Sequence, residues 1–224
     1  MDIIAAIKMR KSIRGYKPNP VSKEILEEIL RIANCSPSAM NTQPWEIYVL
    51  TGKVLENIKR ANIEMLNCGV SPSPEHHVVE KTFEGEYRRR QVELAKQIFE
   101  VMGIVREDKE KRKEWLERGF RFFDAPCAII ICVDKSLGDK GPLIDIGTFL
   151  QTICLTSLNY GLGTCIEDQG VMYPEVLRKF ANIPSSKRII ISIAIGYPDW
   201  DFPANKIKRK RESVENFTTW CGFE

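Results

Sequence analysis

The sequence predicts an α+β sandwich, a single domain in which helices flank one central sheet. Residues 127–133 form a continuous apolar run bounded by Pro126 and Asp134, which is typical of a strand covered on both faces. Residues 188–195 predict a second central strand. Elsewhere apolar residues recur at helical spacing, so that helices and strands follow one another along the chain.

The N-terminal third predicts two helices, a strand and a third helix. The first helix covers about residues 3–8. Ser22 then has the character of an N-cap for a helix over 23–34, in which Ile25, Leu26, Ile29 and Leu30 form an apolar stripe. Residues 46–50 predict a strand, and residues 51–53 a turn into a helix that ends near residue 62.

The middle of the chain predicts a helical excursion, within residues 62–120, near the active site. Residues 84–120 are charged and helix-prone, with an interruption near Gly103. A long apolar helix over 143–160 follows, with Pro142 before it and Gly161 after it. Residues 143–162 are long enough to suggest a membrane span, but Asp145 and Gln151 argue against one.

Composition indicates one globular domain over residues 1–224. The chain has 43% apolar and 28% charged residues and a formal charge of +3, which does not indicate nucleic-acid binding. Seven cysteines without a paired spacing predict reduced thiols, and those in apolar runs, Cys127, Cys132 and Cys154, predict small buried side chains. His76 and His77 lack metal-ligand spacing, so no metal is expected. The start shows no secretory signal, which favours the cytoplasm.

Two polar segments near the N-terminus predict a flavin site. Residues 10–14 read Arg-Lys-Ser-Ile-Arg, and arginine can grip a phosphate through two parallel charge-assisted hydrogen bonds. Residues 37–45 read Pro-Ser-Ala-Met-Asn-Thr-Gln-Pro-Trp. The two prolines stiffen this backbone, and Ser38, Asn41 and Gln43 offer hydrogen-bond donors and acceptors to the edge of a planar heterocycle.

In combination, these segments are similar to those of the FMN-dependent nitroreductase family. Further family-like features are residues 145–147 with Gln151, residues 161–165, and the basic run that ends at Arg211. Lys11 stands where the family more often has arginine. This weakens the case for a second arginine-type contact, with two parallel hydrogen bonds to the phosphate, at that position. The resemblance implies a mixed, mainly antiparallel sheet and an intertwined homodimer with one FMN at each of two subunit interfaces.

The resemblance also implies which residues bind FMN. Arg10, Ser12 and Arg14, helped by Lys11, would hold the phosphate and ribityl chain. Arg211, with Lys208 or Arg209 as helper, would close on the same phosphate, although such a basic run is often only a solvated tail. Pro37, Ser38 and Asn41 would reach the flavin of the partner subunit.

The remaining expected contacts are with the flavin ring. The main chain of Cys165, Ile166 and Glu167 would face the isoalloxazine, with an amide near its N5 atom. Gln151 would either contact the ring edge or satisfy a buried polar group. Arg118 and Arg121 are weaker candidates for the flavin pyrimidine oxygen. No catalytic side chain is expected, because the flavin carries the chemistry.

The resemblance implies ping-pong electron transfer from NADH or NADPH to a small electron-poor aromatic acceptor. Residues 87–90, 102–104 and 120–126 are similar to a nitrobenzoate reductase-like subgroup, and a cation among Arg88, Arg89 and Arg90 would pair with the acceptor carboxylate. The alternative is that these arginines lie on a solvated helix face. Reductive dehalogenation of halophenols, flavin fragmentation, a non-enzymatic flavin-binding protein and a nucleic-acid-binding module remain alternative functions.

Overall fold

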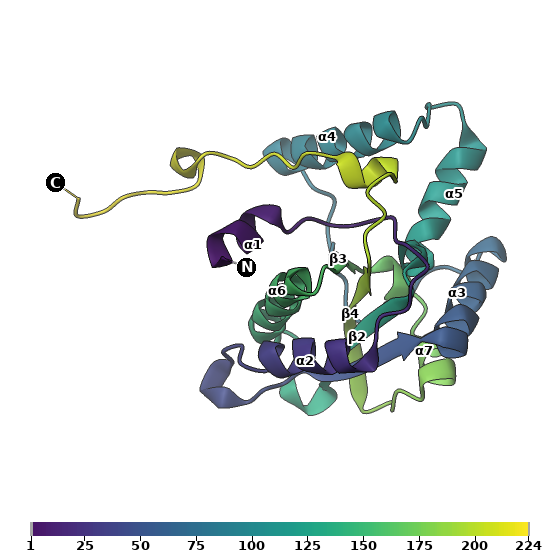
Figure 1. Ribbon diagram of the computed structural model, residues 1–224, viewed down its shortest axis with the longest axis horizontal. Helices are drawn as coiled ribbons and strands as arrows, with labels where there is room; N and C mark the ends of the chain where they lie inside the picture. Colours follow the sequence, from purple (N-terminus) through teal and green to yellow (C-terminus); the bar gives the residue numbers. More distant parts are fainter. Residues whose placement is uncertain (1, 224) are drawn as a thin grey trace.

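Residues 2–223 are described by the computed structural model, and they form seven α-helices and four strands (Figure 1). The helices are α1 (Ile3–Met9), α2 (Lys23–Ala33), α3 (Gly52–Asn67), α4 (Gly85–Val101), α5 (Lys109–Phe120), α6 (Leu143–Asn159) and α7 (Pro174–Ala181). The strands are β1 (Glu46–Thr51), β2 (Cys127–Asp134), β3 (Gly163–Glu167) and β4 (Lys187–Gly196). Short 3-10 segments are η1 (Ala39–Asn41), η2 (Phe122–Asp124), η3 (Lys135–Leu137), η4 (Gln169–Val171), η5 (Pro203–Lys206) and η6 (Val214–Asn216).

The four strands form one sheet in the order β1-β2-β4-β3. Strands β2 and β4 occupy its centre, which confirms the prediction for residues 127–133 and 188–195. Every pair of neighbouring strands is antiparallel. The expectation of a mixed sheet is therefore wrong for the part of the chain that the structure describes. A parallel pairing does occur next to the sheet, as an isolated bridge between Ser12 and Thr164. The N-terminal segment runs beside β3 there without becoming a strand.

Helices cover both faces of the sheet, so the core has two halves. Side chains of β2 alternate between them: Ile129 and Ile131 pack in one half with α2 and α6, whereas Ile130 and Cys132 pack in the other with α3 and α7. Figure 1 shows α2 and α6 on one side of the strands and α3 and α7 on the other. This two-sided burial explains the continuous apolar sequence of β2.

The predicted N-cap at Ser22 and the predicted interruption near Gly103 are both confirmed. The Ser22 hydroxyl accepts a hydrogen bond from the Ile25 amide at the start of α2, and Gly103, with φ +61°, lies between α4 and α5. The predicted turn at residues 51–53 is wrong, because α3 begins at Gly52 and continues to Asn67. Cys127, Cys132 and Cys154 are buried free thiols, as predicted.

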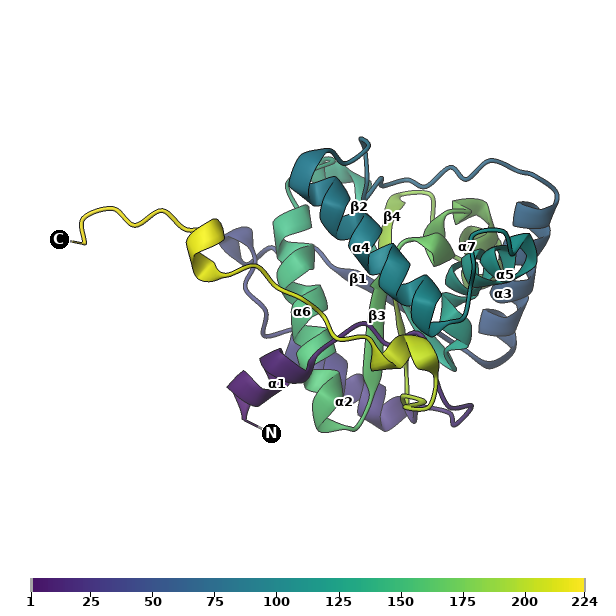
Figure 2. The same cartoon turned by 90° about the horizontal axis from the view of Figure 1, so that it is seen from above.

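Helices α4 and α5 and the C-terminal segment cover one side of the domain. In Figure 2, α4 crosses the molecule and the segment around η5 lies beside its end, close to the chain that follows α1. Beyond η5 the chain first passes between α1 and α4, and the part that carries η6 extends away from the body (Figures 1 and 2). No helix among residues 2–223 combines the length and apolar character needed to cross a membrane.

Candidate functional site

A cleft of about 520 Å³ lies between the loop after α1, helix α4 and the C-terminal segment, and we call it the basic cleft. Eight cations among the described residues line it: Arg10, Lys11, Arg14, Arg89, Arg90, Arg209, Lys210 and Arg211. Its two lining carboxylates are Glu93 and Glu212, and Ser12 contributes a hydroxyl group. The structure therefore brings together the cations predicted for the phosphate from both ends of the sequence.

The cations on the N- and C-terminal side of the cleft repel one another. Burial lowers the pKa of Arg209, and the positive charges of Arg10 and Arg211 lower it further. The pKa of Lys11 is lowered by burial and by the charge of Arg209. A group of cations without nearby carboxylates is stabilised by a bound anion. A phosphate monoester, with two negative charges and several acceptor oxygens, fits this set of donors.

The loop carrying Ser12 and Arg14 is fixed through its main chain. The Ile13 amide donates to the Thr164 carbonyl of β3 at 2.9 Å. Asn205, which is buried, holds the loop from the C-terminal segment: its Oδ1 accepts from the Arg14 amide at 2.7 Å and its Nδ2 donates to the Gly15 carbonyl at 2.8 Å. Asn205 could not be identified from the sequence, because no local pattern links it to a loop 191 residues earlier.

The basic run near the C-terminus is divided between the cleft and solvent. Arg209, Lys210 and Arg211 line the cleft, and Lys208 is exposed and does not. Arg209 donates to the carbonyl oxygens of Ile7 and Lys8 at the end of α1, where a helix carries partial negative charge. Of the two predicted helpers for Arg211, the structure places Arg209 at the site.

Helix α4 lines the opposite side of the cleft with cations that are already paired. Arg90 Nε lies 3.0 Å from a Glu212 carboxylate oxygen, and an Arg89 Nη atom lies 3.6 Å from the same oxygen. These contacts tie the C-terminal segment to α4. Arg88 does not line the cleft and instead donates to Gln91.

Strand β3 brings the predicted ring-facing residues next to the loop. Cys165 and Glu167 are buried and Ile166 is half-buried. Burial raises the pKa of the Cys165 thiol to about 12, so the thiol is protonated near neutral pH. Burial likewise raises the pKa of the Glu167 carboxyl to about 7. The main chain here was expected to face a flavin ring, but the strand itself was not predicted.

Pro37, Ser38 and Asn41 are not part of the basic cleft. Their segment is fastened to the first half of α6, where Asp145 accepts from the Ala39 amide at 3.2 Å and the Thr148 hydroxyl donates to the Pro37 carbonyl at 3.1 Å. In Figure 2 it lies on the outer side of α6, and β3 lies on the inner side.

The segment has a strained and exposed backbone. Met40, Asn41 and Gln43 have φ of 50°, 58° and 47°, a left-handed conformation that non-glycine residues adopt at an energetic cost. The Met40 side chain is 98% exposed. Gln151 is also exposed, on α6, so it does not satisfy a buried polar group within this chain.

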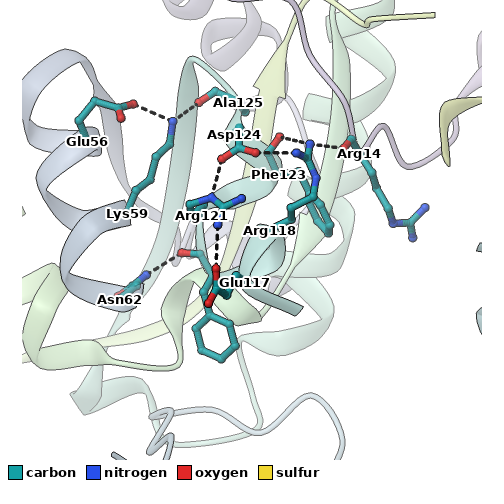
Figure 3. A network of polar contacts seen from close by, with 11 residues as sticks. Arg14, Glu56, Lys59, Asn62, Glu117, Arg118, Arg121, Phe123, Asp124 and Ala125 are labelled. Carbon is teal, nitrogen blue, oxygen red and sulfur yellow. Dashed lines mark hydrogen bonds and ion pairs between the residues drawn. The ribbon is translucent and has the colours of Figure 1, made fainter. Parts of the chain in front are cut away.

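Arg118 and Arg121 bind protein groups. Arg121 pairs with Asp124 and Glu117 and does not line the basic cleft. Arg118 pairs with Asp124 at 2.7 Å and donates to the Arg14 carbonyl at 3.1 Å (Figure 3). Among residues 2–223, no three His, Cys, Asp or Glu side chains gather in a group able to hold a metal ion.

Comparisons with known proteins agree with this geometry. The model of the nitroreductase family matches residues 7–197. The chain is 34% identical to the nitrobenzene nitroreductase of Ectopseudomonas oleovorans, covering 96% of this chain and 94% of the relative. It is 30% identical to the 4-nitrobenzoate reductase of Pseudomonas putida, covering 100% and 97%. The structure of the FMN- and NADPH-dependent nitroreductase NfnB from sphigopyxis sp. strain HMH superimposes with a TM-score of 0.94 at 25% identity, over 100% of both chains.

Proposed function

This chain belongs to the nitroreductase family, and we propose that it is an FMN-dependent enzyme that passes electrons from NAD(P)H to nitroaromatic acceptors. The observation that carries the proposal is the set of cations on the N- and C-terminal side of the basic cleft, which form no ion pair among residues 2–223 and lie beside the edge strand β3. Bound FMN would supply the electron transfer, and the protein supplies binding, orientation and electrostatics.

The phosphate would be held by Arg10, Arg14 and Arg211, with Lys11 and Arg209 adding positive charge and Ser12 a hydroxyl group. These groups reach one cleft from both ends of the chain. Beyond the bridge to Ser12, the neighbour of β3 within the described chain is β4 alone. The outer main-chain groups of residues 165–167 are therefore available to a planar ring placed against this edge.

We further propose a homodimer in which a second copy supplies Pro37, Ser38 and Asn41. Within one chain these residues lie outside the cleft, on the other side of α6. Apolar side chains within and next to this segment are exposed: Met40 is 98% exposed, and Ile144, the neighbour of Asp145 on α6, is 79% exposed. Apolar surface of this kind is typical of an interface between subunits.

The acceptor is proposed to be a nitroaromatic compound, with carboxylated nitroarenes as the favoured class. Two relatives that span nearly the whole chain support this choice, a nitrobenzene reductase and a 4-nitrobenzoate reductase. Arg90, and to a lesser degree Arg89, is the candidate partner for the carboxylate, because both line the basic cleft and Arg88 does not.

The first test is to titrate the apo-protein with FMN and with riboflavin. The cation cluster predicts that FMN binds far more tightly, since riboflavin lacks the phosphate. The holoprotein is then mixed anaerobically with NADH or NADPH, and afterwards with 4-nitrobenzoate, while flavin absorbance is followed. Bleaching by the nucleotide and recovery with the acceptor is the expected result. Equal affinity for the two flavins, or a flavin that neither nucleotide reduces, would contradict the proposal.

A further inference from the structure

The turn after α5 has a strained backbone that no glycine explains. Phe122, Phe123 and Asp124 have φ of 55°, 52° and 58°, which are three successive non-glycine residues in the left-handed region. Each such residue is energetically unfavourable and persists only where surrounding contacts determine the conformation. Contacts from the surrounding structure must therefore hold the turn in this conformation.

Side chains from α3 and α5 hold this turn from two sides (Figure 3). From α3, the Lys59 ammonium donates to the Ala125 carbonyl at 2.8 Å, and the Asn62 amide donates to the Phe120 carbonyl at 3.0 Å. From α5, Arg118 donates to the Phe123 carbonyl at 3.3 Å. The turn is thus a rigid base, anchored before, within and after its left-handed residues.

Arg118 connects that base to the loop of the basic cleft. The same Nη2 atom that donates to Phe123 also donates to the Arg14 carbonyl at 3.1 Å, and Nη1 pairs with Asp124 at 2.7 Å. The Arg14 guanidinium in turn lies over the Phe123 ring, 5.9 Å from its centroid. The main chain of Arg14 is therefore held by Arg118 on α5, and its side chain lies against the turn.

A second contact between Arg118 and the loop runs through Phe202. The Arg118 guanidinium stacks over the Phe202 ring at 4.6 Å from its centroid. The ring also lies against Gly15, where an added Cβ would lie only 2.2 Å from Phe202. Phe202 is thus enclosed between Arg118 and the residue that follows Arg14. Arg118 has only 16% of its side chain exposed, so these contacts are largely shielded from water.

We propose that Arg118 is a positioning residue, which sets the loop 10–14 for the FMN phosphate without touching the cofactor. This inference rests on the proposed function. Its role requires the planar fork of arginine, because two carbonyl oxygens, a carboxylate and an aromatic ring are engaged at once. Lysine would keep the charge but could not make these contacts together.

Arg121 provides a matched control. It pairs with the same Asp124, at 2.8 Å, and lies in the same helix–turn junction, but the structure shows no contact between it and Arg14. Arg118→Lys and Arg121→Lys therefore both weaken the junction, and only the first loses the link to the loop.

The experiment measures the FMN dissociation constant of the wild-type protein and both variants by quenching of flavin fluorescence. The apo-protein unfolding midpoints and the hydrogen exchange of peptides covering residues 10–17 are recorded in parallel. Arg118→Lys is expected to weaken FMN binding about 10-fold or more and to accelerate exchange in the loop. Arg121→Lys is expected to change neither by more than about 2-fold.

Equal FMN affinity of Arg118→Lys and wild type would overturn the inference, and so would equal losses in the two variants. If Arg118→Lys does not fold, Phe202→Leu removes the ring between Arg118 and Gly15 and keeps an apolar side chain there. Weaker FMN binding by that variant supports the inference, and unchanged binding overturns it. A wild-type protein that does not bind FMN would instead contradict the proposed function.

Discussion

Glu167 and Ser192 face each other on neighbouring strands β3 and β4, and the Ser192 hydroxyl donates to the main-chain oxygen of Glu167 at 2.8 Å. The hydroxyl also contacts the Glu167 carboxylate, whose other oxygen accepts from the Gly170 amide at 2.8 Å. A carboxyl group is therefore buried at the end of β3, where the main chain is proposed to face the flavin. Its hydrogen bonds do not fully offset the loss of hydration, because its pKa is raised to about 7.

Stability is expected to fall as pH rises through the range that this carboxyl controls. Between about 4.5, the ordinary pKa, and about 7, the folded protein retains a proton that the unfolded chain has released. The free energy of unfolding decreases across this window. Above the window the decrease is complete, on the order of 3 kcal/mol. Glu167→Gln should remove this dependence, so that the variant gains stability over wild type between pH 4 and pH 8.

Urea unfolding at both pH values measures that difference. Glu175→Gln, on the exposed surface of α7, is the control and should leave the pH dependence of wild type unchanged. Parallel stability curves for wild type and Glu167→Gln would show that the carboxyl ionises equally easily in the folded and unfolded chain.

The basic run offers a prediction about phosphate recognition. Arg211→Ala is expected to weaken FMN binding about 10-fold or more and leave riboflavin binding unchanged, because a charge-assisted hydrogen bond to the phosphate is lost. Lys208→Ala changes a cation of the same run that does not line the cleft, and it should preserve both affinities. Isothermal titration with the two flavins distinguishes the variants. An equal loss for FMN and riboflavin would show that Arg211 acts on the fold instead.

Mixing two defective variants tests whether the site is shared between subunits. Arg14→Ala and Asn41→Ala should each lower nitroreductase activity. After the two are unfolded together and refolded, about half of the dimers are mixed, and each mixed dimer has one site with both residues intact. About a quarter of the wild-type activity should therefore return. No recovery above the separate variants would place Arg14 and Asn41 at the same chain's site or outside it.

Acceptor choice provides a prediction for α4. Arg90→Gln should lower kcat/KM for 4-nitrobenzoate about 2- to 5-fold relative to nitrobenzene, the effect of one partly exposed ion pair. Arg88→Gln should leave this ratio unchanged, because Arg88 lies outside the cleft and contacts Gln91. Steady-state rates with both acceptors provide the ratio. A ratio that stays constant in both variants would assign the arginines to a solvated face of α4.

Local patterns predicted the elements that have strong local signals. The N-cap of α2, the apolar run of β2 and the glycine break between α4 and α5 could each be read from a few neighbouring residues. Strand β3 was missed because it has five residues and begins with a glycine, and α7 because it has only eight residues. The end of α3 was predicted near residue 62, but the helix continues to Asn67. Local signals there are weak, and packing of α3 against α5 and α7 adds to them.

The sequence indicated several of the charged residues that gather in the basic cleft but not the residues that support them. Charge and hydroxyl content identified the loop 10–14, and the structure does place Arg209 and Arg211 beside it. Asn205, Arg118 and Phe202 were not recognised as supports of this loop, because each depends on contacts between segments far apart in the chain. The left-handed run at residues 122–124 was also unforeseen, since no glycine marks it.

The hydrogen bonds of Asn205 to the loop after α1 have a consequence for synthesis on the ribosome. The loop emerges among the first residues, but its partners at Thr164 and Asn205 follow 152 and 191 residues after Ser12 and Arg14. Until the last part of the chain has left the exit tunnel, the loop lacks the contacts that shape it. The geometry of the proposed phosphate site is thus set only after Asn205 has been synthesised, so the proposed FMN binding would follow the synthesis of more than 200 residues.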